Sequence, residues 1–222
     1  MSAADDVGDG VRAYGQEALL VDVAGAAEAA RLATALRADA TARDRPLVDV
    51  VPAARTVLVR VPPGTDLAEV AGWARSVRAR RSDEPVAEGR DVVVDVVYDG
   101  ADLDDVAAAT GLDVAEVVAR HGAATYRAAF AGFAPGFVYL TGLDPALHLP
   151  RRATPRKRVP AGSVAVAAEF SAVYPRSGPG GWHLLGRTDA VMFDAGADRP
   201  ALVQPGDRVR FHPVPAPRGR TR

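Results

Sequence analysis

The distribution of proline and glycine constrains this chain more than any other feature. Twelve of the 17 prolines lie beyond Phe130, and glycine is dense over the same stretch. Proline lacks an amide hydrogen and glycine permits left-handed turns, so this half is not expected to hold long helices. Short apolar runs between such residues are typical of strands joined by structured loops. The sequence therefore predicts a compact β-barrel or sandwich in the second half.

The first half alternates runs that are typical of strands with runs that are typical of helices. Their order, β-α-β-β-α-β, is that of a ferredoxin-like α+β module of about 90 residues. Pro62-Pro63-Gly64 ends one strand, and Thr65 is the expected cap of the helix that follows. The expected strands cover 18–23, 47–51, 56–61 and 91–98, and the expected helices cover 25–39 and 65–80.

Two short helices are predicted between the halves. They cover 103–110 and 114–121, with Gly111 and Gly122 as expected C-terminal stops. Asp113 and Glu116 resemble a capping box. The pair of helices resembles a DNA-binding helix-turn-helix. However, these two acidic residues lie at the N-terminal end of the second helix, which would meet the DNA phosphates. We therefore expect a helical hairpin packed on the barrel and no nucleic-acid partner.

Composition limits the compartment and the chemistry. The chain has 222 residues, a formal net charge of −1 and no cysteine, which excludes disulfides, Cys-based zinc sites and thiol catalysis. The acidic start, Met1 to Gly10, lacks the basic and apolar regions of a signal peptide. No run approaches the ~18 apolar residues of a membrane span. We expect a cytoplasmic protein with no membrane partner.

Motifs for metal, nucleotide or serine-hydrolase chemistry are missing from the sequence. The histidines are His121, His148, His183 and His212, and none has a metal-binding spacing. No G-x-x-x-x-G-K-[ST] loop is present, so any nucleotide binds through other geometry or on another subunit. Ala161-Gly-Ser-Val-Ala165 departs from G-x-S-x-G. His121 ends a predicted helix, where a protonated ring is favourable, so a structural role stays open for it.

A basic cluster is the strongest chemical signal. Five cations occupy the eight positions from Arg151 to Arg158, between Pro150 and Pro160. Arginine binds carboxylate and phosphate through two parallel hydrogen bonds, which suits a small anionic substrate. A solvated basic loop is the alternative. Lys157 is the chain's one lysine, so any mechanism that needs a lysine has this candidate alone.

An ordered series of motifs runs through the second half. It comprises Phe130-Ala-Gly-Phe-Ala-Pro-Gly-Phe-Val-Tyr-Leu140, Gly142-Leu-Asp-Pro145, Pro150-Arg-Arg-Ala-Thr-Pro-Arg156, Val159-Pro-Ala-Gly-Ser-Val164, Tyr174-Pro175, Pro179-Gly-Gly-Trp182, Gly186-Arg-Thr188 and Pro205-Gly-Asp207. Tyr98-Asp-Gly100, Asp102-Leu103 and His121 followed by Tyr126 extend it. Over about 92–212 this set resembles the KipI / allophanate-hydrolase-subunit-1 family, which includes the B-type chains of 5-oxoprolinase.

The resemblance implies a fold and a domain division. The fold is α+β, with an N-terminal ferredoxin-like α/β module followed by a cyclophilin-like β-barrel domain. The implied boundaries are 10–91 for the first domain and 92–214 for the second, and a Pro- and Arg-rich tail over 215–222 is expected to be disordered.

The resemblance also implies a function in a complex. Family members pair with a homologous second subunit, and in 5-oxoprolinase a third subunit joins. The complex opens the 5-oxoproline lactam to L-glutamate at the expense of ATP, which binds here or on another subunit, and the chain alone is expected to be inactive. Two alternatives share the architecture. One is a binding module that inhibits a sensor histidine kinase, and the other is a carboxyl-transfer module related to urea carboxylase.

Candidate site residues follow from the motifs. The expected substrate-binding residues are Phe133, Pro135, Gly136, Arg151, Arg152, Arg156, Gly162, Ser163, Tyr174, Pro179, Gly180, Gly181 and Trp182, and the expected catalytic residues are His121 and Glu169. One segment departs from the family, which often has Gly-Gly-x-Gln-Thr-Gly before Tyr-Pro. This chain reads Ala167-Ala-Glu-Phe-Ser-Ala172 there, so Phe170 replaces an amide side chain. Glu169 is either a general base or a surface carboxylate.

Overall fold

A computed structural model describes residues 10–80 and 89–216 of the chain. The chain divides into two compact units, Met1–Ala87 and Glu88–Arg222, and each is described by itself. The predicted disordered tail over 215–222 lies outside the described residues except for Pro215 and Ala216.

The first unit is a four-stranded antiparallel sheet with two helices. Its elements are β1 (Val11–Ala13), β2 (Ala18–Asp22), α1 (Ala26–Ala42), β3 (Asp49–Pro52), β4 (Thr56–Arg60) and α2 (Leu67–Arg80). The sheet order is β1-β2-β4-β3. Leu19 and Val21 on β2 and Val57 and Val59 on β4 are buried, which follows from the period-two alternation of side chains along a strand.

The expected last strand of the ferredoxin-like order lies elsewhere. β5 (Asp91–Val96) belongs to the second unit, where it pairs in parallel with β13 (Arg208–Pro213). The reason is packing, because Val92, Val94 and Val96 are buried in the core of that unit. In the first sheet, β1 occupies the edge beside β2. The expected cap of α2 is also wrong, since Asp66 rather than Thr65 accepts the Ala68 N–H, at 2.8 Å.

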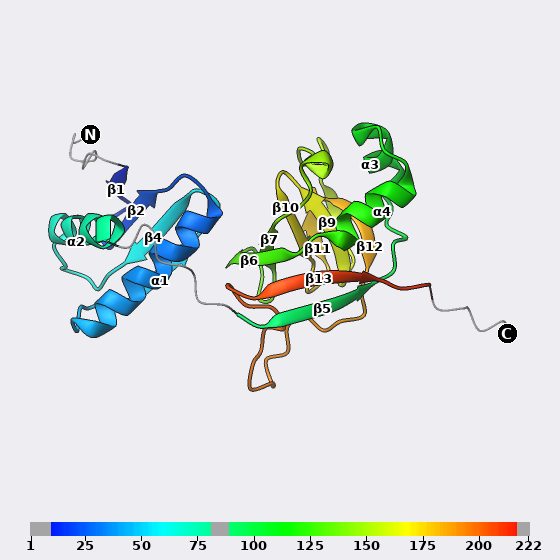
Figure 1. Ribbon diagram of the computed structural model, residues 1–222. Helices are drawn as coiled ribbons and strands as arrows, with labels where there is room; N and C mark the ends of the chain where they lie inside the picture. The colour runs from blue at the N-terminus through cyan, green and yellow to red at the C-terminus, as the bar shows by residue number, and fades with distance from the viewer. Residues whose placement is uncertain (1–9, 81–88, 217–222) are drawn as a thin grey trace. The chain divides into compact units, whose positions relative to one another are not determined.

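The second unit is built on a seven-stranded sheet that curls into a nearly closed barrel (Figure 1). The sheet order is β12-β9-β10-β7-β6-β13-β5, and β8 pairs with β11 in a separate two-stranded sheet. The remaining elements are α3 (Leu103–Thr110), α4 (Val114–Ala123), β6 (Tyr126–Ala131), β7 (Val138–Thr141), the 3₁₀ turn η1 (Pro145–Leu147), β8 (Arg156–Val159), β9 (Ser163–Ala167), β10 (Phe170–Val173), β11 (Gly178–Gly180) and β12 (His183–Arg187). The prediction of a β-rich second half is confirmed.

The barrel closes where the two edge strands meet. The backbones of Val97 and Arg187 exchange two hydrogen bonds of 2.9 Å, just beyond β5 and at the end of β12. A Cβ on Gly186 would lie 2.4 Å from the Val97 carbonyl oxygen, and a Cβ on Gly100 would lie 2.3 Å from that of Leu184. Only glycine permits backbones to approach this closely, so the Gly-rich motifs serve barrel closure.

The start of α4 and the end of α3 are as the sequence predicts. Asp113 caps α4 by accepting the Glu116 N–H at 2.7 Å, and Gly111 ends α3 with a left-handed φ of 71°. Gly122 is not a stop, because α4 continues to Ala123. A Cβ on Gly122 would lie 3.1 Å from the Pro213 ring, so this glycine lets α4 pack closely on β13.

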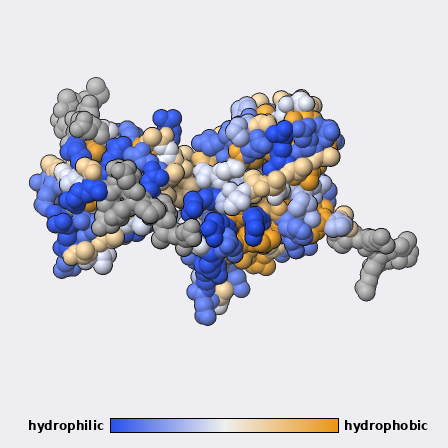
Figure 2. Space-filling model, viewed as in Figure 1, coloured by the Kyte–Doolittle hydropathy of each residue, from blue (hydrophilic) through white to orange (hydrophobic). Residues whose placement is uncertain are grey.

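The barrel core is apolar, and some apolar residues also reach the surface. Val96, Tyr126, Leu147, Leu185 and Phe211 are among the fully buried side chains. In the space-filling view of the second unit, hydrophobic surface lies among hydrophilic areas (Figure 2). The exposed large apolar residues of this unit are Val93, Phe133, Val191 and Phe193. Within the described residues, no helix is long and apolar enough to cross a membrane.

Candidate functional site

An aromatic cluster occupies one part of the barrel wall. We define it by the rings of Phe130, Phe133, Phe137, Tyr139, Phe170, Tyr174 and Trp182, which come from β6, β7, β10 and the segments beside them. Phe137 is central, with ring centroids 5.3 Å from Tyr174 and 5.6 Å from Trp182. The edge-to-face geometry of these pairs suits the quadrupoles of aromatic rings. The Phe-rich and Pro-Gly-Gly-Trp motifs therefore meet in space.

Phe133 is the exposed member of the aromatic cluster. This residue is 59% exposed, and its backbone is left-handed, with φ of 69°. A bulky residue seldom adopts this conformation, which costs of order 1–3 kcal/mol. Pro135 is exposed beside it, while Gly136 is buried, and a Cβ there would lie 2.7 Å from that of Phe193. The loop thus holds one strained aromatic ring at the surface.

Tyr174 connects the aromatic cluster with the basic segment. Its phenol is buried, and a Cβ on Gly180 would lie 2.2 Å from its oxygen. Burial raises the pKa of Tyr174, while the charge of Arg151, the backbone N–H of Trp182 and the charge of Arg156 act in the opposite direction. The strand pairing supports this proximity, because Arg156 on β8 is the partner of Gly180 on β11.

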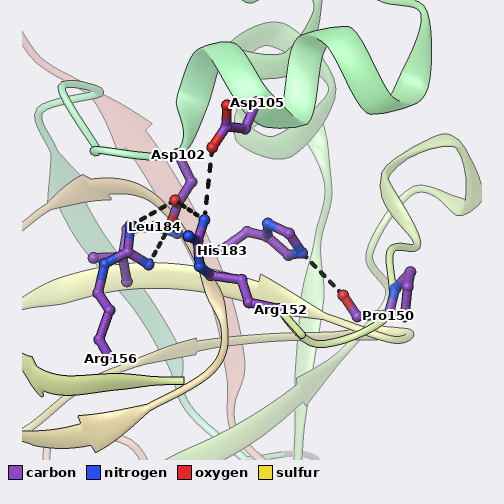
Figure 3. A network of polar contacts seen from close by, with 7 residues as sticks. All are labelled: Asp102, Asp105, Pro150, Arg152, Arg156, His183 and Leu184. Atoms are coloured by element: carbon purple, nitrogen blue, oxygen red, sulfur yellow. Dashed lines mark hydrogen bonds and ion pairs between the residues drawn. The ribbon is translucent and has the colours of Figure 1, made fainter. Parts of the chain in front are cut away.

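Two arginines of the basic segment converge on one buried carboxylate, that of Asp102 (Figure 3). Arg156 donates from Nη1 to Oδ2 at 2.8 Å and from Nη2 to Oδ1 at 2.6 Å, and Arg152 donates from Nη1 to Oδ1. The backbone N–H of Leu184 donates to Oδ2 at 2.8 Å. We call Asp102, Arg152 and Arg156 the Arg–Asp cluster.

Charge and backbone contacts fix the Arg–Asp cluster in place. Burial opposes ionisation of Asp102, but the hydrogen bonds from Arg156 and Leu184 and the charges of both arginines outweigh it and lower its pKa. The loop itself is tied to the segment at β12. The Arg152 N–H donates to the Gly181 carbonyl at 2.8 Å, and Nε2 of His183 donates to that of Pro150 at 2.9 Å (Figure 3).

The other cations of the basic segment face outward. Arg151, Lys157 and Arg158 are exposed, and Nε of Arg158 donates to Ser177 Oγ at 3.0 Å. The expected cluster therefore separates into two arginines that turn inward and three cations at the surface. The solvated-loop alternative describes Lys157 and Arg158, while Arg151 lies near Tyr174.

His121 lies in a buried polar network. The ring is fully buried and stacks on Phe211, with a centroid distance of 4.7 Å. Nδ1 lies 2.6 Å from the Tyr98 hydroxyl, and Nε2 lies 2.9 Å from Ser171 Oγ. Burial lowers the pKa of His121 to about 3, so the ring is neutral. The expectation of a protonated ring at the end of the helix is therefore wrong. Both nitrogens are engaged, which favours the structural alternative.

Other predicted site residues have varied surroundings. Glu169 is exposed in the turn between β9 and β10, whereas Phe170 is buried in the aromatic cluster. Ser163 is buried and donates to the Pro160 carbonyl at 2.9 Å, and a Cβ on Gly162 would lie 2.2 Å from the Thr188 carbonyl oxygen. Pro179 is exposed on β11 beside Gly180. Within 10–80 and 89–216, no three His, Asp or Glu side chains are grouped to hold a metal ion.

Reasoning from the sequence missed Asp102 as a site residue. Its one signal was its place in the Asp102-Leu103 motif, and nothing there indicates arginines 50 and 54 positions later as partners. It also missed four members of the aromatic cluster, which are Phe130, Phe137, Tyr139 and Phe170.

Comparisons with known proteins agree with this picture. The family model "Carboxyltransferase domain, subdomain C and D" matches residues 10–203. The B-type chain of 5-oxoprolinase from Escherichia coli O157:H7 is 44% identical over 161 residues, which is 71% of this chain and 73% of the relative. The protein of the same name from Haemophilus influenzae is 42% identical over 127 residues, 56% of this chain and 60% of the relative.

Solved structures with the same fold include longer chains. The crystal structure of TTHA0988 matches with a TM-score of 0.73 and 38% identity, and covers 90% of this chain. This chain spans 40% of TTHA0988. The urea amidolyase of K. lactis has a TM-score of 0.74 at 18% identity over 92% of this chain and 15% of its own, which shows the fold alone. On the family match and the sequence identity, this chain belongs to the carboxyltransferase subdomain C and D family, among relatives that are B-type chains of 5-oxoprolinase.

Proposed function

We propose that this chain is the B-type subunit of an ATP-dependent 5-oxoprolinase, which opens the lactam of 5-oxoproline to L-glutamate. One observation carries the assignment to this chain's own residues: the Arg–Asp cluster lies beside a buried tyrosine of the aromatic cluster, in a protein whose relatives are named as B-type chains of 5-oxoprolinase. 5-Oxoproline is a small carboxylate with a compact ring. An oriented arginine suits its carboxylate, and aromatic faces suit its ring.

The chemistry explains the need for ATP. A lactam carbonyl is a poor electrophile, and transfer of the γ-phosphoryl group to its oxygen turns that oxygen into a leaving group. A first water molecule then adds to the carbonyl carbon, and the C–N bond breaks with a proton passing to nitrogen, which leaves an acyl phosphate. A second water molecule hydrolyses this acyl phosphate to the carboxylate and free phosphate. Anionic groups develop at these steps, so a site with fixed cations lowers their energy. We assign the substrate carboxylate to Arg152 and Arg156 and assign ATP to the complex as a whole.

The proposal includes partner subunits. A homologous second subunit and a third subunit complete the enzyme, and the chain alone lacks turnover. The match to 40% of the longer TTHA0988 chain supports an arrangement in which this fold works beside further polypeptide. The proposal also takes the second unit to be the cyclophilin-like barrel that the resemblance predicts.

Arg156→Ala in the reconstituted complex tests the site. Loss of a bidentate contact to a carboxylate costs about 1.5–3 kcal/mol, so KM for 5-oxoproline is expected to rise about ten- to hundred-fold. Lys157→Ala, on the same strand and exposed, is the matched control and is expected to leave KM unchanged. Circular dichroism checks the fold of both variants.

Two results would contradict parts of the proposal. Unchanged constants for both 5-oxoproline and ATP in Arg156→Ala would place the site elsewhere. Efficient ATP-dependent cleavage by the purified single chain would refute the requirement for partners.

A further inference from the structure

Asp102 occupies a helix-capping position without capping the helix. It directly precedes α3, where an aspartate usually accepts an N–H of the first helical turn. Its side chain makes no such bond. The backbone instead pairs with β12, because the Asp102 N–H donates to the Leu184 carbonyl at 3.1 Å while the Leu184 N–H donates to Oδ2 at 2.8 Å. The carboxylate is therefore turned away from the helix and towards the basic loop.

The two arginines that Asp102 binds are only partly buried. The side chain of Asp102 is 1% exposed, whereas those of Arg152 and Arg156 are 30% and 25% exposed. Arg156 binds through both terminal nitrogens, which fixes the plane of its guanidinium group. A buried anion thus orients two partly exposed cations.

The charge balance of the cluster also suits an anionic ligand. One carboxylate neutralises one guanidinium group, so Asp102, Arg152 and Arg156 together carry one net positive charge at neutral pH. Asp105 lies 3.6 Å from Arg152 but is 69% exposed, so solvent screens most of its effect. Without Asp102, the two arginines would repel each other and lose a fixed direction.

We propose that Asp102 is a positioning residue, which orients Arg152 and Arg156 towards the carboxylate of the small anionic substrate without touching the substrate itself. This inference rests on the proposed function. A purely structural ion pair would affect stability and leave KM of the folded complex unchanged, so the two roles give different measurements.

Asp102→Asn is the central variant because it preserves shape and removes the charge. In the assembled complex, KM for 5-oxoproline is expected to rise about tenfold, with kcat changed less than about threefold. Asp104→Asn is the matched control, since Asp104 is exposed on the first turn of the same helix. It is expected to leave both constants unchanged. An unchanged KM in Asp102→Asn would overturn the inference.

A mutant cycle tests whether Asp102 acts through the two arginines. In a background that carries both Arg152→Gln and Arg156→Gln, Asp102→Asn is expected to change KM by less than about twofold, because both groups that it orients are gone. Independent, multiplicative effects would overturn the inference. If Asp102→Asn does not assemble, Asp102→Glu replaces it, and the longer side chain is expected to raise KM while keeping the charge. A KM equal to that of the wild type would then refute the role.

A spectroscopic measurement separates this inference from the proposed function. In the full chain with ¹⁵N-labelled arginine, Arg156 side-chain signals are expected to be dispersed in the wild type and in Asp104→Asn. In Asp102→Asn they are expected to collapse into the averaged arginine envelope. Persistent dispersion would refute positioning even if the enzyme is active. Absence of ATP-dependent cleavage by the wild-type complex would refute the proposed function alone, and these signals would still decide the role of Asp102.

Discussion

The hydroxyl of Tyr98 lies 2.6 Å from Nδ1 of His121, a ring with no exposure to solvent. Ser171 Oγ donates to the Ala165 carbonyl at 3.3 Å, so it is free to accept a hydrogen from His121 Nε2. Nδ1 then carries the lone pair that accepts the Tyr98 hydrogen. The network is satisfied only when His121 is neutral.

This network makes a prediction about acid stability. The pKa of His121 is lowered from 6.5 to about 3 by burial, so below about pH 6.5 the unfolded chain takes up a proton that the folded chain does not. The contribution of neutral His121 to the free energy of unfolding is therefore complete above pH 6.5 and is lost as the pH falls towards 3. His121→Gln is expected to be less stable than the wild type at pH 7. As the pH falls, the difference in free energy of unfolding between the two proteins is expected to narrow by up to about 1.4 kcal/mol per pH unit.

Urea unfolding of both proteins between pH 7 and pH 4 measures this gap. Carboxylates titrate in both proteins, so their contribution cancels in the difference. Parallel stability curves would show that His121 takes up a proton in the folded state and would contradict the neutral network.

The fold was predictable where one local rule decides the structure. Asp113, Glu116 and Gly111 specified the start of α4 and the end of α3, because capping and left-handed glycine are properties of a few adjacent residues. The sheet to which the strand within residues 91–98 belongs was not predictable in the same way. Its alternating valines fit any half-buried sheet face, and only pairing with β13, more than 100 residues later, decides which sheet receives it.

The site was predictable as a set of motifs but not as a geometry. Proline, glycine and aromatic residues indicated which loops matter, and Phe133, Tyr174 and Trp182 do come together. The motifs did not reveal which arginines turn inward. That depends on Asp102, whose position follows from the close approach of Gly100 to β12, a tertiary contact without a local signature.

Phe133 provides a test that separates stability from function. Phe133→Gly removes ring contacts with Phe137 and Tyr174 but also relieves the left-handed strain at φ of 69°. The two effects oppose each other, so the free energy of unfolding is expected to change by less than about 1 kcal/mol. Activity of the reconstituted complex is expected to fall at least about tenfold, because the exposed aromatic face is lost.

Ala168→Gly is the control for the relief of backbone strain at an exposed position. Ala168 is an exposed left-handed residue of the same unit, with φ of 49°, and carries no ring. Its replacement is expected to leave activity unchanged. Equal activity of Phe133→Gly and Ala168→Gly would show that the Phe133 ring has no functional contact.

Gly180 and Gly178 offer a matched pair of substitutions on β11. A Cβ on Gly180 would lie 2.2 Å from the Tyr174 oxygen and 2.8 Å from Cζ, whereas a Cβ on Gly178 would meet nothing within 4 Å. Tyr174 is 2% exposed and packs on Phe137, so its ring has little room to yield. Gly180→Ala is therefore expected to destabilise the protein by about 1–3 kcal/mol, and Gly178→Ala by less than about 0.5 kcal/mol.

A double substitution shows whether the phenol oxygen causes the loss. Tyr174→Phe removes the atom nearest to the new methyl group but leaves Cζ at 2.8 Å, so Gly180→Ala is expected to cost less in that background without becoming neutral. Thermal unfolding of the four proteins of the cycle measures the coupling. Additive effects would mean that the phenol oxygen of Tyr174 does not cause the loss, which would contradict the close contact between this oxygen and Gly180.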